Sequence, residues 1–92
     1  MYFILFYKTV DDYLERRIQY RERHLNYAMD SHNRGELIIA GAYSEPADGA
    51  VLIFKAESST IVEDFAKNDP YVIYGLVVEW TVRKWTVVIG GD

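Results

Sequence analysis

Six large apolar and aromatic residues follow one another from Tyr2 to Tyr7, and a run of this kind narrows the possible folds at once. Aromatic and β-branched residues favour an extended strand, and the lack of alternation with polar residues indicates a strand buried on both faces. Because successive side chains of a strand point to opposite sides, three of these six residues would lie on each face of a sheet. Both faces of that sheet therefore need a cover.

The chain has 92 residues, of which 50% are hydrophobic, 15% aromatic and 26% charged. This length and composition are typical of a compact globular unit, and we expect residues 1–92 to form a single domain. Cysteine is absent from the sequence, which excludes disulfides, thiolate metal sites and cysteine nucleophiles.

The formal net charge of -4 has the wrong sign for attraction to phosphate backbones or anionic lipid, so nucleic acid and membrane surfaces are not expected partners. The apolar run at residues 2–7 is far shorter than the roughly 20 residues that span a bilayer, and no basic leader with a cleavage site accompanies it. The protein is therefore expected to be cytoplasmic.

A long helix is predicted between the first strand and Gly35. Thr9 and Asp12 have the spacing of a capping box, so the helix would begin near Val10. From Val10 to Arg34 it would be about 37 Å long at 1.5 Å per residue, longer than the strands, so one end is expected to overhang or fray. The expected apolar stripe of this helix is formed by Leu14, Ile18, Leu25, Ala28 and Met29.

The second half of the chain predicts two strands, a helix and a last strand. Residues 36–43 and 50–56 read as paired strands joined by a turn at residues 44–49. A second helix would start at Ser58 or Ser59 and end near Asn68, before Asp69 and Pro70. Residues 76–88, rich in valine and tryptophan, give the last strand.

The resulting order βαββαβ predicts an α+β, ferredoxin-like fold, with an antiparallel four-stranded sheet and two helices on one face. Two helices cover one side of the sheet only, and the aromatic second side needs a partner. We therefore expect a homodimer, or a higher even oligomer, in which sheet packs against sheet to form a dimeric α/β barrel.

Two ionisable residues are candidates for acid–base chemistry. His24 falls roughly 90° from the centre of the expected apolar stripe, at a border where a half-buried imidazole can face a cleft and exchange protons near neutral pH. Asp69 closes the second helix, where the helix dipole disfavours a carboxylate, and it would orient His24 if the two helices meet. Position alone leaves two alternatives open: a surface histidine, and an Asp-Pro pair that only opens a turn.

Other chemistries have no support in the sequence. His32 follows His24 by eight residues, about 12 Å along a helix, which is too far for both to hold one metal ion. The sequence contains no Gly-rich phosphate loop, no nucleophile elbow and no RNA-binding strand motif. No cofactor and no metal ion are expected.

Several short motifs are shared with a known family. They are Arg23-His24-Leu25, Gly35-Glu36-Leu37, Ala40-Gly41, Asp48-Gly49-Ala50, Glu57-Ser58, Asn68-Asp69-Pro70-Tyr71 and Gly75-Leu76. In this order and spacing they resemble the YCII-related family over nearly the whole chain. The resemblance implies a ferredoxin-like dimeric α+β barrel, related in shape to muconolactone isomerases and cofactor-free monooxygenases.

The same resemblance implies functional residues. The family has a histidine and aspartate pair proposed as its active site, and His24 and Asp69 match those positions. Tyr71 and Gly41, from the matched Asp-Pro-Tyr and Ala-Gly motifs, are the candidate substrate-binding residues. One activity known in the family is dehydrochlorination of a hydroxylated aromatic compound.

Two hypotheses follow for the function. The first is a cofactor-independent lyase or isomerase that acts on a carbonyl-bearing or hydroxylated cyclic compound, with His24 as general base and then general acid and Asp69 as its orienting partner. The second is a non-catalytic dimeric module that binds a small ligand or a protein, in which the same pair only locks two helices together.

Overall fold

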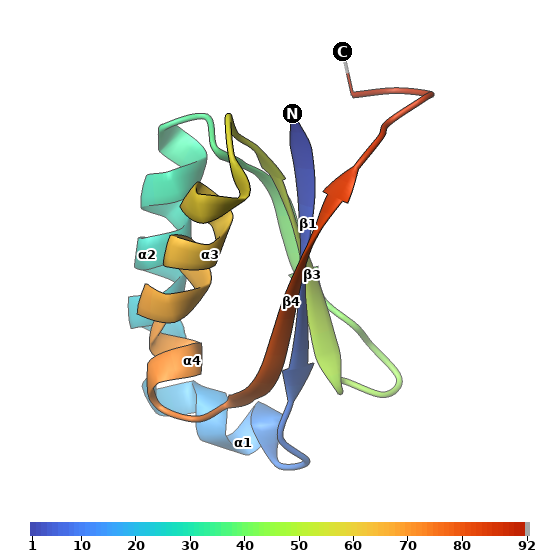
Figure 1. Ribbon diagram of the computed structural model, residues 1–92. Coiled ribbons are helices and arrows are strands. Elements are labelled where there is room, and N and C mark those ends of the chain that lie inside the picture. The colour runs from blue at the N-terminus through green and yellow to red at the C-terminus, as the bar shows by residue number, and fades with distance from the viewer. Residues whose placement is uncertain (92) are drawn as a thin grey trace.

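The computed structural model describes residues 1–91 as a four-stranded sheet with helices packed on one side (Figure 1). In chain order the elements are β1 (Tyr2–Thr9), α1 (Tyr13–Arg16), a 3-10 turn η1 (Arg17–Gln19), α2 (Arg21–Asn33), β2 (Leu37–Ala42), β3 (Gly49–Lys55), α3 (Ser59–Asn68), α4 (Pro70–Ile73) and β4 (Val77–Trp85). The predicted order of strands and helices and the ferredoxin-like fold are confirmed. Among these residues, no helix is long and apolar enough to cross a membrane.

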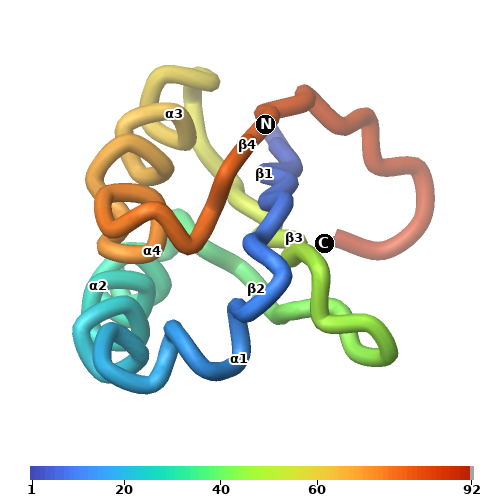
Figure 2. The backbone as a smooth tube through the Cα atoms, turned by 90° about the horizontal axis from the view of Figure 1, so that it is seen from below, coloured from blue at the N-terminus to red at the C-terminus, as the bar shows by residue number. Residues whose placement is uncertain are grey.

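The sheet has the strand order β2-β3-β1-β4, with every neighbouring pair antiparallel. The apolar run that opens the sequence forms β1, an inner strand, where Leu5 lies opposite Leu52 of β3 and Val82 of β4. Both α2 and α3 lie on the same side of the sheet in two perpendicular views (Figures 1 and 2).

The two faces of the sheet have different surroundings. On the helix side, Phe3, Leu5 and Tyr7 of β1 are buried in the core with Leu52 and Phe54 of β3. The other side, which we call the open face, has no helix over it. From the strand register, the open face carries the apolar residues Tyr2, Ile4, Phe6, Ile39, Val51 and Ile53, and beside them the polar residues Lys55, Thr81 and Arg83.

The C-terminal segment leaves β4 toward the open face (Figure 2). The Tyr2 hydroxyl donates a hydrogen bond to the Gly91 carbonyl at 2.5 Å. Val88 and Ile89 of this segment are 86% and 91% exposed, so they add apolar surface beyond the sheet. β4 ends at Trp85, earlier than the predicted Val88.

The prediction of one helix from Val10 to Arg34 is wrong. The chain forms α1, then η1, and starts α2 only after Tyr20. Thr9 ends β1 instead of capping a helix, and the side chain of Asp12 makes no capping hydrogen bond. The break has a geometric reason, since the 13 residues of α2 span about 20 Å and match a six- to eight-residue strand. An unbroken helix would overrun the sheet.

Of the predicted apolar stripe of this helix, only Ala28 packs against the core. Leu14, Ile18, Leu25 and Met29 are between 48% and 76% exposed. Because the break changes the helical phase, residues before and after it do not share one continuous face. The buried or half-buried positions of α2 are His24, Tyr27, Ala28 and Ser31.

The second helix ends at Asn68 as predicted, but a further short helix follows it. Asp69 stands between the two: it ends α3 and begins α4, and its side chain accepts the backbone N–H of Tyr71. Pro70 at the first helical position of α4 suits this junction, because its missing N–H would have no partner there.

Candidate active site

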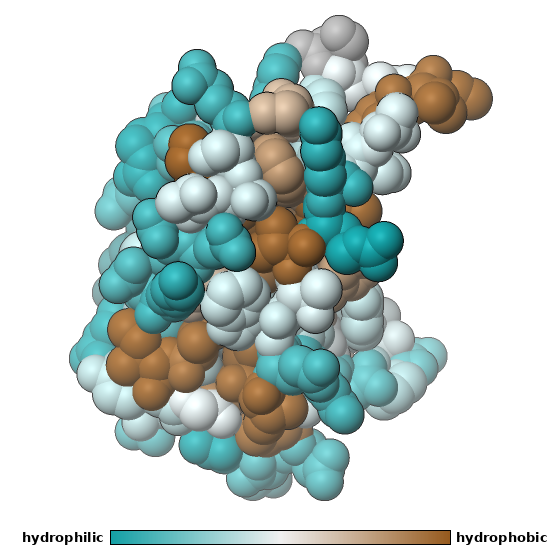
Figure 3. Space-filling model, in the orientation of Figure 1, coloured by the Kyte–Doolittle hydropathy of each residue, from teal (hydrophilic) through white to brown (hydrophobic). Residues whose placement is uncertain are grey.

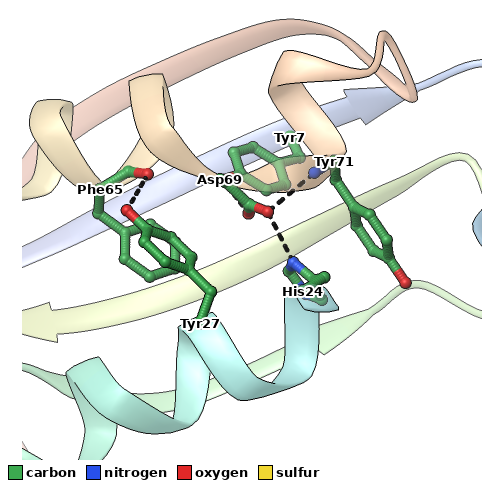
Figure 4. A network of polar contacts seen from close by, with 6 residues as sticks. All are labelled: Tyr7, His24, Tyr27, Phe65, Asp69 and Tyr71. Carbon is green, nitrogen blue, oxygen red and sulfur yellow. Dashed lines mark hydrogen bonds and ion pairs between the residues drawn. The ribbon is translucent and has the colours of Figure 1, made fainter. Parts of the chain in front are cut away.

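Asp69 is fully buried and is the centre of a polar cluster (Figure 4). Its Oδ2 accepts a hydrogen bond from the Tyr7 hydroxyl at 2.7 Å. Its Oδ1 lies 2.7 Å from Nδ1 of His24 and 3.0 Å from the backbone nitrogen of Tyr71, which donates to it. Three donors, from β1, α2 and α4, compensate for the removal of the carboxylate from water.

His24 is held from two sides. One side is the contact with Asp69, 45 positions away in the sequence. The other is the ring of Tyr71, stacked on the imidazole with centroids 3.8 Å apart and planes 7° from parallel. Because a carboxylate accepts and does not donate, Nδ1 carries a hydrogen, and in the neutral ring Nε2 is then an acceptor. The His24 side chain keeps 16% of its surface exposed, whereas that of Asp69 keeps none.

The tyrosines around the pair stay protonated at neutral pH. Burial, together with the charge of Asp69 and the hydrogen bond to it, raises the pKa of Tyr7 far above its ordinary range. Burial raises the pKa of Tyr71 to about 12. Tyr27, whose pKa is raised to about 12 mainly by burial, donates to the Phe65 carbonyl at 2.8 Å and ties α2 to α3.

A cavity of about 210 Å³ lies beside the pair, between α2 and the β2–β3 part of the sheet. Ala28, Ala40, Ala42 and Ala50 contribute to its wall, and such short side chains leave space between helix and sheet. An apolar cavity of about 150 Å³ takes up benzene in another protein, so this volume suits one substituted ring. Among residues 1–91, no group of three or more His, Asp or Glu is placed to hold a metal ion.

The residues singled out from the sequence have different positions relative to this cavity. His24, Tyr71 and Gly41 line it, whereas Asp69 stands behind His24 and does not contribute to the wall. His32 lies outside the lining, and its Nδ1 is 2.7 Å from the Leu37 carbonyl, which links the end of α2 to β2.

Sequence reasoning missed Thr9, Tyr13, Arg17 and Arg21 as residues of the wall. It counted Tyr7 among the aromatic residues that could line a pocket, but not as a partner of Asp69. The alternation in β1 puts Tyr7 and Thr9 on the helix side together with Phe3 and Leu5, and this signal was available. No sequence signal identified the two arginines as part of the wall, because their position depends on the break between α1 and α2.

The family model for YCII-related domains matches residues 1–86. The chain belongs to the YCII-related domain family. Over 97 aligned residues, the chain is 27% identical to an uncharacterized protein of Haemophilus influenzae, with 96% of this chain and 99% of that protein covered.

A solved structure of similar shape comes from Burkholderia phenoliruptrix AC1100. It is the 5-chloro-2-hydroxyhydroquinone dehydrochlorinase TftG, in complex with 2,5-dihydroxybenzoquinone. The TM-score is 0.79, the sequence identity is 26%, and the match covers 94% of each chain. The family predicted from the shared motifs is thus confirmed.

Proposed function

We propose that this YCII-related protein is a cofactor-independent enzyme of lyase or isomerase type that acts on a hydroxylated or carbonyl-bearing ring compound. The observation that carries the proposal is an imidazole fixed by a buried carboxylate at the wall of a ring-sized cavity. The dehydrochlorination named for TftG supports a reaction of this class.

In the proposed reaction, Nε2 of His24 takes a proton from a hydroxyl group or from a carbon next to a carbonyl. The electron pair of that bond forms a new double bond. In a lyase, a leaving group such as chloride departs with its own electron pair, and in an isomerase the proton returns at another atom. A positioned general base of this kind contributes typically 10²- to 10⁴-fold in rate, roughly.

Asp69 acts through His24 in this proposal. Its carboxylate keeps the hydrogen on Nδ1, points Nε2 away from itself and stabilises the imidazolium that forms when the proton is taken. Tyr7 holds the second carboxylate oxygen at 2.7 Å and remains a donor, so Asp69 keeps one orientation. Tyr71 fixes the imidazole plane by stacking.

We further propose that a second copy of the chain covers the open face. Phe6 and Ile39 on that face are 37% and 66% exposed, and contiguous apolar surface of this kind is typical of an association site.

The test is an assay of the wild type and of His24→Asn and Asp69→Asn on hydroxylated ring compounds, beginning with the chlorinated hydroquinone that TftG acts on. Chloride release and deuterium uptake from solvent are followed by NMR. We expect kcat to fall by about 100-fold or more in His24→Asn and less in Asp69→Asn, with circular dichroism unchanged. Equal turnover in the wild type and His24→Asn contradicts the proposal.

The alternative, a non-catalytic binding module, gives the opposite pattern. If His24 only joins two helices, His24→Asn lowers the melting temperature and leaves ligand affinity intact, whereas a residue of an active site is often neutral or costly for stability. Glu22→Gln is the matched control, because Glu22 is an exposed residue of the same helix and lies outside the cavity.

A further inference from the structure

Two arginines stand at the cavity with no acidic partner. Arg17 of η1 and Arg21 of α2 both line it, seven and three residues before His24 in the sequence. The guanidinium carbon of Arg17 lies 5.3 Å from the ring centroid of Tyr13, which holds that side chain at the wall. Among residues 1–91, neither arginine forms an ion pair. Like charges four residues apart repel each other, so this pair favours the entry of an anion.

Two buried hydroxyl groups stand in the same wall. Thr9 is 6% exposed, and its Oγ1 makes no hydrogen bond within residues 1–91, whereas Tyr71 is 3% exposed and has the Arg21 side chain within hydrogen-bonding reach of its hydroxyl. Arg21 is close enough to lower the pKa of Tyr71, although burial outweighs it and the value is raised to about 12. The Tyr71 hydroxyl is therefore a donor at neutral pH. A buried hydroxyl without a partner is costly unless a bound molecule supplies one.

Much of the remaining wall is apolar. Leu25, Leu52 and the small residues of β2 and β3 form it. The cavity thus combines a ring-sized apolar part with cationic and hydroxyl donors. A guanidinium group pairs best with a planar, two-oxygen anion, which it can bind through two parallel hydrogen bonds.

We infer that the cavity selects a single-ring carboxylic acid, with the carboxylate held by Arg17, Arg21 and the Tyr71 hydroxyl and the ring against the apolar wall. The inference rests on the proposed function and narrows its substrate class from ring compounds in general to ionised ring acids. Arg17 and Arg21 are then the specificity-determining residues of the site.

The experiment compares two probes of the same size and shape, 2-hydroxybenzoate and its neutral analogue 2-hydroxybenzamide, at pH 7. Affinities are measured by isothermal titration calorimetry, and amide shifts in ¹⁵N-labelled protein locate the site. We expect the wild type to bind the carboxylate at least about tenfold more tightly than the amide. In the Arg17→Gln/Arg21→Gln double variant, we expect the two probes to bind within about twofold of each other. Tyr71→Phe should weaken the binding of the carboxylate several-fold and the binding of the amide by a smaller factor.

Arg23→Gln is the matched control. Arg23 lies on the same helix but outside the lining, where it donates to the Tyr74 hydroxyl at 3.0 Å. Its loss should leave the preference for the carboxylate unchanged. Equal affinities of the wild type for the two probes, a preference that survives in the double variant, or amide shifts away from the cavity would overturn the inference.

The same proteins separate this inference from the proposed function. His24→Asn should keep the preference for the carboxylate while it loses turnover. A charge preference that depends on the arginines, combined with full turnover in His24→Asn, supports this inference and removes the proposed function. If His24→Asn loses turnover but the wild type shows no preference for the carboxylate, the proposed function is supported and this inference is removed.

Discussion

Adjacent residues of β1 have opposite environments on the two faces of the sheet. Leu5, on the helix side, is fully buried, and its neighbour Phe6, on the open face, is 37% exposed. The helix side holds the core and, within it, a fully hydrogen-bonded carboxylate beside a cavity. The open face exposes apolar side chains such as Phe6 and Ile39, and it also carries Lys55 and Arg83, which pair with Tyr2 and Ile4 in the sheet. One strand thus separates a face with a buried polar cluster beside a cavity from a face with exposed apolar side chains.

The space-filling view shows where further apolar surface lies (Figure 3). Apolar atoms gather around α4, where Ile73 is 59% exposed, and along the C-terminal segment, where Ile89 is 91% exposed. The second group continues the open face, because that segment extends on the same side and Tyr2 is bonded to it. The contrast between the faces therefore reaches beyond the sheet.

The largest effect is expected from Asp69→Ala. The change leaves Tyr7, His24 and the backbone N–H of Tyr71 without their acceptor in a buried place, so the free energy of unfolding should fall by about 3–5 kcal/mol. Urea denaturation at pH 7 measures this loss of unfolding free energy. Asp64→Ala, an exposed carboxylate on α3, is the control and should change stability by about 0.5 kcal/mol or less. A loss equal to that of the control would mean that the buried cluster adds no stability.

The next effect compares the faces directly. Leu5→Ala should lower the free energy of unfolding by about 2–5 kcal/mol, because it opens a hole in the core. Phe6→Ala should cost about 1–2 kcal/mol in the isolated chain, since 37% of the residue's surface is already in water.

Sedimentation of the same variants at micromolar concentration sharpens the comparison. If a second copy covers the open face, the Phe6 variant shifts the protein toward monomer and the Leu5 variant does not. A wild type that sediments as a monomer contradicts the proposed dimer.

The smallest effect is a pH dependence of stability that belongs to the helix side alone. An unfolded tyrosine loses its proton at about pH 10, whereas folded Tyr7 keeps it to a higher pH because burial and Asp69 raise its pKa. Above about pH 10 the unfolded state binds fewer protons, so stability falls by up to about 1.4 kcal/mol per pH unit from this residue, and below that pH its contribution is complete. Urea denaturation between pH 9 and 11 should give a shallower slope for Tyr7→Phe. An identical slope in the variant would show that the Tyr7 proton is not held in this way.

The sequence was sufficient for the order of elements and for the ferredoxin-like sheet, because strand alternation and turn residues are local signals. The sequence failed between Val10 and Arg34, where the length of the sheet limits the length of the helix. No helix-breaking residue near Tyr20 indicates the break. The position of Asp69 at a helix end suggested it as a partner of His24, and family resemblance, not periodicity, favoured that assignment over a simple Asp-Pro turn. Asp69 also begins α4, a role that the expected turn at Asp-Pro did not include.

The cavity lay beyond sequence reasoning for a related reason. Its space results from short side chains on α2, β2 and β3 that meet only in the folded chain, and its arginines enter the wall only because η1 redirects the helix. The catalytic roles, the substrate-binding residues, the single domain, the pairing of sheets and the cellular compartment stay predictions.

The contacts of Asp69 also bear on the order in which the molecule folds. They join segments 45 and 62 positions apart, so they form only after α2, the end of α3 and β1 have come together. Pairings over such separations form late, because the entropy of closing long loops must be lost first. A nascent or partly folded chain therefore has His24 without its buried carboxylate partner, and under the proposed function it would gain an oriented base only when folding is complete.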